Sequence, residues 1–286
     1  MKQLKLTRTI RQLLYLTAII FIPITNIYAL NSNKGSDTKN RILIDQNGKR
    51  IIHAVHLNDE IKIDGRLEEA AWEAVTFLGD FLQREPNEGA IATERTEIGV
   101  LYDQRNLYFG IKCFDSEPEK IIAREMRRDA IVDDDDYFEI VIDTYHDKRS
   151  GYYFITNAHG SKREAQLANE GRDFNPAWDG VWWCKSAITH EGWFLEIAIP
   201  RKTLRFAEQD SSVWGINFAR MIRRKNEHVY WQNIPRHLGG AGLFRLSEAG
   251  TLQGMTDLKM GGNLEPIDFN LDLLHVNKIF NFFFRY

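Results

Sequence analysis

The residues of this chain best suited to chemistry are its tryptophans, of which there are seven. The segment Trp178-Asp179-Gly180-Val181-Trp182-Trp183 brings three indoles close to a carboxylate, and Trp231 follows a predicted turn by a few residues. Trp182 and Trp183 are neighbours on a predicted strand, so one points toward the core and the other toward solvent. Exposed aromatic rings beside carboxylate, amide or guanidinium groups suit the apolar C–H face and hydroxyl rim of a sugar ring.

A second feature is the acidic run Asp133, Asp134, Asp135 and Asp136, which precedes a predicted strand. Four neighbouring carboxylates repel one another, and a hard cation would relieve that repulsion, so the run is a candidate Ca²⁺ site. The spacing and the glycine of an EF-hand are absent. A solvated acidic loop is the competing interpretation.

Paired carboxylates for glycoside hydrolysis do not appear locally. Glu139 and Asp143 share a strand face, but four residues of strand separate their backbones by ~13 Å. Typical glycosidase carboxyl groups lie ~5 to 9.5 Å apart. No nucleophile elbow, HExxH motif, phosphate loop or dinucleotide fingerprint occurs. We therefore expect no enzyme activity, with glycoside hydrolysis as the weaker alternative.

The overall composition is that of a globular protein, with 43% hydrophobic and 27% charged residues. The formal net charge of -3 argues against nucleic acid as a partner, because no excess of Lys or Arg exists to neutralise phosphates. Cys113 and Cys184 each lie among bulky residues of a predicted strand. We expect two buried, unpaired thiols, and a single disulfide remains the alternative.

The N-terminus has the order of a secretory signal peptide. Four basic residues and no acidic one lie among its first 11 positions, an apolar run follows from Leu13 to Ile24, and Ala29 offers a small residue for cleavage. The apolar run is shorter than the ~20 residues that span a bilayer, which disfavours an uncleaved anchor. Residues 1–29 are thus predicted to be a signal peptide and 30–49 a flexible leader. The protein is expected to be exported, either periplasmic or outer-membrane-associated.

The elements that must position these side chains are mostly strands. Period-two alternation is clearest over Tyr137 to Thr144, where Phe138, Ile140 and Ile142 face one way and Glu139 the other. Further strands are predicted at 61–63, 96–102, 107–114, 151–157, 181–188, 193–199, 214–222 and 228–231, with one short helix at 66–75. The predicted fold is all-β, an antiparallel β-sandwich (immunoglobulin-like or jelly-roll-like) over residues 50–256. Residues 257–286 are expected to be a disordered or truncated tail.

Several phrases of the sequence together resemble the family 9 carbohydrate-binding module and its relatives. These phrases are Ile63-Asp64-Gly65-Arg66-Leu67-Glu68-Glu69-Ala70-Ala71-Trp72, Asp135 to Asp143, Tyr153-Phe154 with Asn157 and Gly160, Trp178 to Trp182, Gly192-Trp193 leading into Glu196 to Pro200, Trp214 to Arg220, and Trp231. The match runs in order over about residues 55 to 255. Glu164 departs from the pattern, since relatives usually have Asp there.

More narrowly, the chain is similar to the N-terminal domain of outer-membrane-associated bacterial proteins of unknown function. In those proteins a family 9-like sandwich precedes a segment thought to form a β-barrel. Leu264-Glu265-Pro266 resembles the entry to that segment, after which this chain departs from the pattern and ends. We therefore expect a relative truncated before the barrel.

The resemblance implies a binding function and candidate residues for it. The family binds sugar between aromatic side chains, which makes Trp178, Trp182 and Trp231 the candidate platforms. Glu139 and Arg220 are candidate polar members of the site, and a structural salt bridge or an exposed face is the equal alternative for each. The association of the family with calcium favours Ca²⁺ at the acidic run.

The sequence thus predicts an exported, non-catalytic carbohydrate-binding domain that takes part in carbohydrate catabolism and has a saccharide as its ligand. The alternative is an assembly or plug domain that docks onto an outer-membrane β-barrel partner without binding sugar.

Overall fold

The computed structural model describes residues 43–207, 209–239 and 242–258. The predicted signal peptide, most of the predicted leader and nearly all of the predicted tail lie outside the described residues. Strand pairing begins before the predicted domain start at 50, because β1 (Leu43–Ile44) pairs antiparallel with β2 (Arg50–His53). A tight turn closed by Asp45 joins the two strands, with the Asp45 carboxylate accepting the Asn47 and Lys49 N–H groups at 2.8 Å each.

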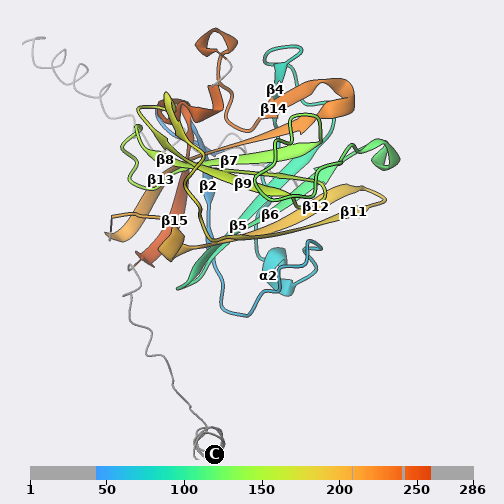
Figure 1. Ribbon diagram of the computed structural model, residues 1–286. Coiled ribbons are helices and arrows are strands. Elements are labelled where there is room, and N and C mark those ends of the chain that lie inside the picture. Colours follow the sequence, from blue (N-terminus) through green and yellow to red (C-terminus); the bar gives the residue numbers. More distant parts are fainter. Residues whose placement is uncertain (1–42, 208, 240–241, 259–286) are drawn as a thin grey trace, which may run out of the picture. The chain divides into compact units, whose positions relative to one another are not determined.

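The described chain forms two sheets that face each other, and Figure 1 shows them as two layers. The order of the first sheet is β1-β2-β15-β13-β7-β8-β9-β10, with β14 and β4 joined to one half of β13; the order of the second is β11-β12-β6-β5-β3. Its remaining strands are β3 (Val55–His56), β4 (Leu82–Glu85), β5 (Thr96–Tyr102), β6 (Asn106–Phe114), β7 (Tyr137–Asp143), β8 (Gly151–Asn157), β9 (Lys162–Ala168), β10 (Asp173–Asn175), β11 (Trp183–Thr189), β12 (Gly192–Pro200), β13 (Gln209–Ile222), β14 (Glu227–Tyr230) and β15 (Gly250–Leu258).

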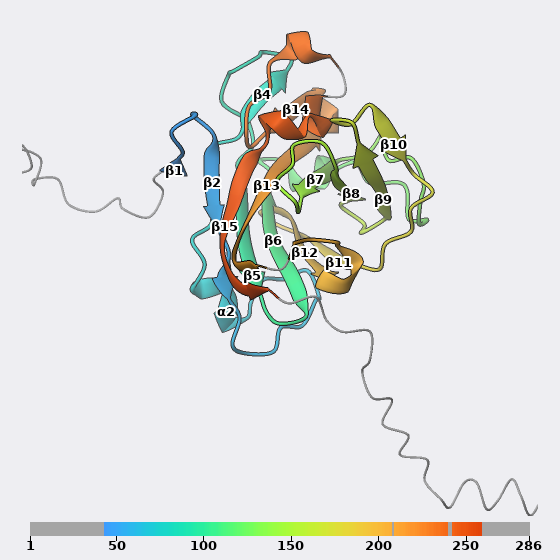
Figure 2. The same cartoon turned by 90° about the vertical axis from the view of Figure 1, so that its left-hand side faces the viewer.

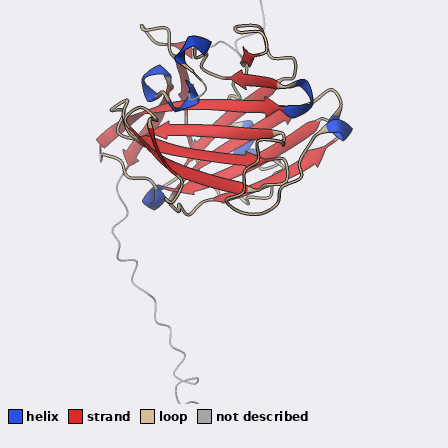
Figure 3. Cartoon of the chain, turned by 45° about the horizontal axis from the view of Figure 1, so that its top comes forward, coloured by secondary structure: helices blue, strands red, loops and turns tan. Residues whose placement is uncertain are grey.

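Helical structure among the described residues is confined to short segments, as the blue elements of Figure 3 show. They are α2 (Ala70–Glu73) and the 3-10 turns η2 (Pro118–Lys120), η3 (Arg201–Thr203), η4 (Arg223–Lys225), η5 (Arg236–Leu238), η6 (Gly242–Phe244) and η7 (Leu246–Glu248). In the part of the chain that the structure describes, no helix is both long and apolar enough to cross a membrane.

Nearly all neighbouring strands are antiparallel, and the two parallel pairs arise where the chain changes sheets. β2 runs parallel to β15 in the first sheet, and β3 runs parallel to β5 in the second. Only Ala54 separates β2 from β3, so this segment links the two layers near their edges. The predicted all-β, mainly antiparallel sandwich is confirmed.

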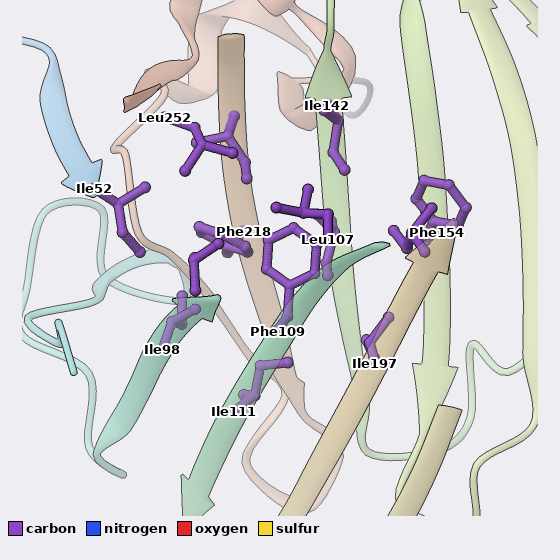
Figure 4. Packing of buried hydrophobic residues seen from close by; sticks show 14 of the residues in the cluster. Ile52, Ile98, Leu107, Phe109, Ile111, Ile142, Phe154, Ile197, Phe218 and Leu252 are labelled. Carbon is purple, nitrogen blue, oxygen red and sulfur yellow. The ribbon is translucent and has the colours of Figure 1, made fainter. Parts of the chain in front are cut away.

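Alternation along each strand fills the space between the sheets. Phe138, Ile140 and Ile142 point into this core as predicted, where they meet aromatic and aliphatic side chains of β5, β6 and β12. Figure 4 shows Phe109 and Ile197 of the second sheet opposite Phe218 and Phe154 of the first. The rings of Phe109 and Phe218 lie 5.9 Å apart, edge to face.

The two cysteines belong to the same core and are unpaired. Cys113 and Cys184 are buried and free. Their strands, β6 and β11, lie on either side of β12, so the thiols occupy separate strands of one sheet. Burial raises the pKa of Cys113 to about 12 and that of Cys184 to about 11. The prediction of two buried thiols is confirmed.

Each sheet is also covered on its outer face, so both sheets have two apolar sides. On the first sheet, Val141 and Tyr153 pack beneath Leu243 and Leu246 of the η6–η7 segment. On the second sheet, residues 57–77 lay Trp72 and Val75 over Tyr108 and Phe194, and Figure 2 shows α2 on that side. This covering explains the near-continuous burial of β7, β8 and β12.

Most predicted strands lie within two residues of observed ones, and two predictions were wrong. Residues 61–63 form no strand, because this segment lies as a covering loop on the second sheet. The helix predicted at 66–75 is reduced to the single turn of α2, since Leu67 adopts a φ of 60°, outside the right-handed helical region.

Candidate functional site

A cleft of about 460 Å³ lies between β8, β9 and the segments that follow β10 and β12. Its aromatic lining comes from Trp178 and Tyr152. Three exposed polar side chains, Gln166, Lys202 and Arg205, complete the rim. Among the described residues, none of these three side chains has a hydrogen-bond partner, so all three are available to a ligand.

Trp178 is half-buried, which leaves part of its ring accessible in the cleft. Its buried side packs against the rings of Tyr152, at 4.9 Å between centroids, and Phe154, at 6.1 Å. Gly180 lies against the same indole, and a Cβ at that position would come within 2.6 Å of the ring. The ring is therefore held in place by its neighbours while one part stays open to solvent.

The segment that carries Trp178 is fastened to β9 by Glu164. This buried carboxylate accepts hydrogen bonds from Trp182 Nε1 at 2.7 Å and from the Gly180 N–H at 3.2 Å. Arg128 also pairs with it and reaches Asp179 at 2.5 Å. Burial raises the pKa of Glu164 above its ordinary value. Glu164 thus holds the Trp178 segment against β9.

The opposite wall is formed by η3 and the residues after it, and hydrogen bonds fix its position. Thr203 Oγ1 donates to the Val181 carbonyl at 2.7 Å, which ties η3 to the Trp178 segment. The Arg205 N–H donates to Tyr152 Oη at 3.0 Å, and Thr144 Oγ1 donates to the Arg205 carbonyl. The backbone beneath the Arg205 side chain is thus held on both sides.

The cleft continues as a second hollow of about 520 Å³ across β9 and β10. Gln166 lines both spaces, and Ser150, Asp173 and Asn175 line the second one. Gln166 is the register partner of both Tyr152 and Asn175, so one row of side chains leads from the aromatic cleft into the second hollow. Figure 2 shows β8, β9 and β10 on the side of the sheet away from β2.

Two of the three predicted aromatic platforms lie inside the core instead. Trp182 and Trp231 are each only 1% exposed, and their rings contact Phe154 at 5.3 Å and Phe218 at 5.6 Å. Neither can present a face to a ligand in this structure. Trp183, which the alternation places on the opposite face from Trp182, is 50% exposed. The choice of Trp182 over its neighbour as the exposed ring was wrong.

Glu139 is a structural residue on the outer face of the first sheet and does not line the cleft. Tyr153 Oη donates to Glu139 Oε1 at 2.7 Å, and His228 Nε2 lies 2.9 Å from Glu139 Oε2. The His228 ring packs edge-on against Tyr230 at 4.9 Å. These partners satisfy the buried carboxylate, as a buried charge requires. The structural alternative considered for Glu139 fits this position.

Arg220 is also structural and is completely buried. Its guanidinium donates to the carbonyls of Arg95 and Phe114 at 3.1 and 2.9 Å and to Thr96 Oγ1 at 3.0 Å. Asp115 lies 3.8 Å away. Arg220 therefore joins the two sheets at one end of the core, and it does not line the cleft.

A charged network adjoins Arg220 at this end. Glu94 Oε1 accepts from Lys225 Nζ at 2.5 Å and from Arg224 Nη2 at 3.0 Å, and Arg224 also reaches Asp115 at 2.6 Å. Burial acts to raise the pKa of Glu94, but its hydrogen bonds, with Lys225 foremost, outweigh burial and lower that pKa to about 2. The carboxylates of Glu94 and Asp115 are thus paired with cationic side chains of the fold.

Three of the four carboxylates of the acidic run have partners within the fold. Asp135 accepts two backbone N–H bonds at 2.9 and 3.1 Å and one from Asn157 Nδ2 at 2.7 Å. Asp136 accepts two more at 2.6 and 3.2 Å. Asp134 pairs with Arg223 at 3.1 Å, and Asp133 is exposed. N–H donors thus engage the buried carboxylates of Asp135 and Asp136, and the four carboxylates do not converge in this structure.

Among the described residues, one group of carboxylates has the spacing of metal ligands, namely Asp64, Glu69 and Glu196. Glu196 is already engaged, since it accepts the N–H groups of Asp64 and Gly65 and Trp72 Nε1 at 2.8 Å each. Gly65 has a φ of +88°, which favours glycine, and its Cα lies against the backbone of β11. This arrangement fixes the covering turn onto the second sheet.

The cleft contains several residues that the sequence did not single out. Trp178 is the predicted platform that does line it. Gln166, Lys202 and Arg205 belong to no recognised phrase. Lys202 and Arg205 follow the strand that ends at Pro200, so a polar segment directly after a buried strand was the available signal. Tyr152 was hidden within an apolar strand.

Comparisons with known proteins agree with this architecture. The family model described as "Carbohydrate family 9 binding domain-like" matches residues 63–232. No curated protein matches the chain by sequence. Among solved structures, a candidate carbohydrate-binding protein from Bacteroides uniformis is similar with a TM-score of 0.57 and 15% identity, covering 71% of this chain and 98% of that chain.

Two further similar structures are of a family 9 carbohydrate-binding module from Caldicellulosiruptor kristjanssonii. The complex with glucose has a TM-score of 0.52 and 14% identity, covering 76% of this chain and 100% of that one. The complex with cellotriose has a TM-score of 0.51 and 13% identity, covering 76% and 99%. At these identities the structures show a shared fold, while the family model covers more than half of the sequence. The chain therefore belongs to the carbohydrate family 9 binding domain-like family.

Proposed function

We propose that this chain is a non-catalytic saccharide-binding domain whose site is the Trp178 cleft. The observation that carries the proposal is a partly exposed indole, supported from below by Tyr152, Phe154 and Gly180, beside polar side chains that have no partner among the described residues. A pyranose ring would lie on the indole, and Gln166 would bond its hydroxyls. The second hollow gives an attached sugar unit room to continue.

The composition of the cleft also supports binding rather than hydrolysis. Glycoside hydrolysis ordinarily needs two carboxyl groups flanking the bond. Among the described lining residues of this cleft, Asp179 is the single carboxylate, and Arg128 pairs with it. The family relationship points the same way. A binding domain that captures a saccharide for a partner in carbohydrate breakdown fits these features best.

Export is part of the proposal and rests on the N-terminal sequence. The basic, apolar and small-residue order of residues 1–29 is that of a signal peptide, which would deliver the domain to the periplasm or the outer membrane. Sequencing the N-terminus of the protein recovered from a cell envelope fraction tests this. A mature chain that begins at Leu30 supports export, and an intact Met1 in the cytosolic fraction contradicts it.

The binding proposal is tested by titrating the full-length chain with mono- and oligosaccharides and following tryptophan fluorescence. Of the seven tryptophans, five are buried, and Trp178 and Trp183 are the two accessible ones. We expect a saturable fluorescence change. Trp178→Ala should lower the affinity by about tenfold or more, as for a central aromatic contact. Trp183→Ala is the matched control and retains binding. A flat response from the folded protein would instead favour the assembly-domain alternative.

A further inference from the structure

Two cations line the aromatic cleft without a counter-charge. Lys202 and Arg205 are exposed at its rim. Among the described residues, neither has a carboxylate within 4.0 Å, and neither side chain makes a hydrogen bond. The one lining carboxylate, Asp179, is paired with Arg128 at 2.5 Å. The cleft therefore carries an excess of positive charge next to Trp178.

This local charge is opposite in sign to that of the whole chain. The chain holds 40 acidic and 37 basic residues, which gives a formal net charge of -3. A positive rim on a negative protein is thus a feature of the cleft and not of the general surface. Because the cleft walls exclude part of the solvent, the two cations attract an anionic ligand more strongly there than on an open face.

The positions of the two cations are set by the same bonds that build the cleft. Lys202 lies within η3, which Thr203 ties to Val181 at 2.7 Å. The Arg205 backbone is held at its N–H by Tyr152 Oη and at its carbonyl by Thr144 Oγ1. Tyr152 also packs on Trp178, so a single side chain, that of Tyr152, links the Arg205 backbone to the aromatic platform.

We infer that the ligand of this cleft is an acidic saccharide, in which a carboxylate or sulfate group pairs with Lys202 and Arg205 while a sugar ring packs on Trp178. The inference rests on the proposed saccharide-binding function. The planar guanidinium of Arg205 suits the two oxygens of such a group, and the ammonium of Lys202 adds a second point charge. Gln166, which is uncharged, remains for the neutral hydroxyls.

The test compares saccharides that differ in charge, using the full-length chain in isothermal titration calorimetry. The acidic probes are trisaccharides of galacturonate, glucuronate and mannuronate and a sulfated galactan oligosaccharide. The neutral probes are the methyl ester of the galacturonate trisaccharide and cellotriose. The ester keeps the ring and linkage of its acidic partner and removes only its charge. The uronate and sulfate arms distinguish the two kinds of acidic group.

The double variant Lys202→Gln/Arg205→Gln identifies the residues responsible. Since an exposed ion pair is worth up to about 1 kcal/mol, we expect each cation to contribute about two- to fivefold in affinity for an acidic probe. The double variant should therefore bind that probe about 4- to 25-fold more weakly and lose much less affinity for the neutral probes. Lys185→Gln, which changes an exposed lysine of β11 outside the cleft, is the control and keeps full affinity.

The outcomes separate this inference from the proposed function. Tighter binding of an acidic probe that high salt and the double variant both remove supports the inference. Equal affinity for the acid and its methyl ester, or Trp178-dependent binding of neutral probes alone, overturns it and leaves the proposed function standing. A flat response to every probe from the folded chain overturns both.

Discussion

Replacing Gly180 by alanine tests whether the position of the Trp178 ring determines binding. A Cβ at Gly180 would lie 2.6 Å from Cη2 of the indole, 2.9 Å from Cζ3 and 3.1 Å from Cζ2. Carbon atoms prefer a separation of about 3.5–4.0 Å, so the ring must move outward by about 1 Å. The substitution keeps the N–H that donates to Glu164 at 3.2 Å. It therefore moves the platform while leaving the fastening of the segment in place.

The magnitude follows from what the indole can contribute. A stacked aromatic contact is worth about 0.5–1.5 kcal/mol beyond the area that it buries. A ring displaced by about 1 Å loses most of that contact with a ligand that Gln166, Lys202 and Arg205 hold in place. We expect Gly180→Ala to weaken saccharide binding by about three- to tenfold. The stability cost should be only about 1 kcal/mol, because a half-buried ring can move toward solvent.

The assay is calorimetric titration of wild type, Gly180→Ala, Trp178→Ala and the double variant with the saccharide that gives the largest fluorescence change. Urea unfolding of the same four proteins shows whether each is folded. If Gly180 acts through the ring, its substitution has no further effect once the ring is absent. Wild-type affinity in folded Gly180→Ala would refute the platform role of Trp178. An undiminished effect of Gly180→Ala in the Trp178→Ala background would refute it as well.

Three more predictions concern the scaffold and can be checked by chemical denaturation. Trp182→Ala should lower the free energy of unfolding by about 3–5 kcal/mol and Trp183→Ala by less than about 1 kcal/mol, and equal costs would contradict the assignment of their faces. Asp135→Ala should cost about 1–3 kcal/mol because it leaves buried N–H groups unpaired, whereas Asp133→Ala is neutral. The folded pKa of Glu94, about 2, lies below its ordinary value of 4.5, so its stabilisation is present above pH 4.5 and is lost as the pH falls toward 2. That loss amounts to at most about 3 kcal/mol, and Glu94→Gln should flatten this part of the pH profile.

The strands were predictable wherever the sequence alternates with a period of two, so that every second residue is an apolar residue of one sheet face. β5 and β8 coincide with the segments 96–102 and 151–157 that alternation marked. β9 and β4 were missed because Lys162–Ala168 and Leu82–Glu85 are largely polar. For β9 the polarity has a physical reason: Glu164 and Gln166 face the Trp178 segment and the cleft, while Ala165 and Leu167 on the opposite face are buried in the packing outside the first sheet.

The candidate site was harder to predict. Alternation shows that neighbouring side chains lie on opposite faces of a strand, but it does not show which face is buried. It separated Trp182 from Trp183 without saying which one enters the core. That choice depends on Glu164, a partner 18 residues away that accepts the Trp182 N–H. Arg220 and Glu139 were ambiguous for the same reason, since their partners lie on other strands. Only the fold reveals which charges are paired.

The residues that identify the family and the residues that line the cleft are largely different sets. Asp64-Gly65, Glu196 and Trp72 fasten the covering turn, and Asp135 holds the loop before β7. Trp182 fills the core, and of the aromatic residues in the family phrases only Trp178 lines the cleft. The family resemblance therefore predicts the scaffold and the position of one platform. The charge preference of the site is set by Lys202 and Arg205, which can change without disturbing any of the bonds that build the sandwich.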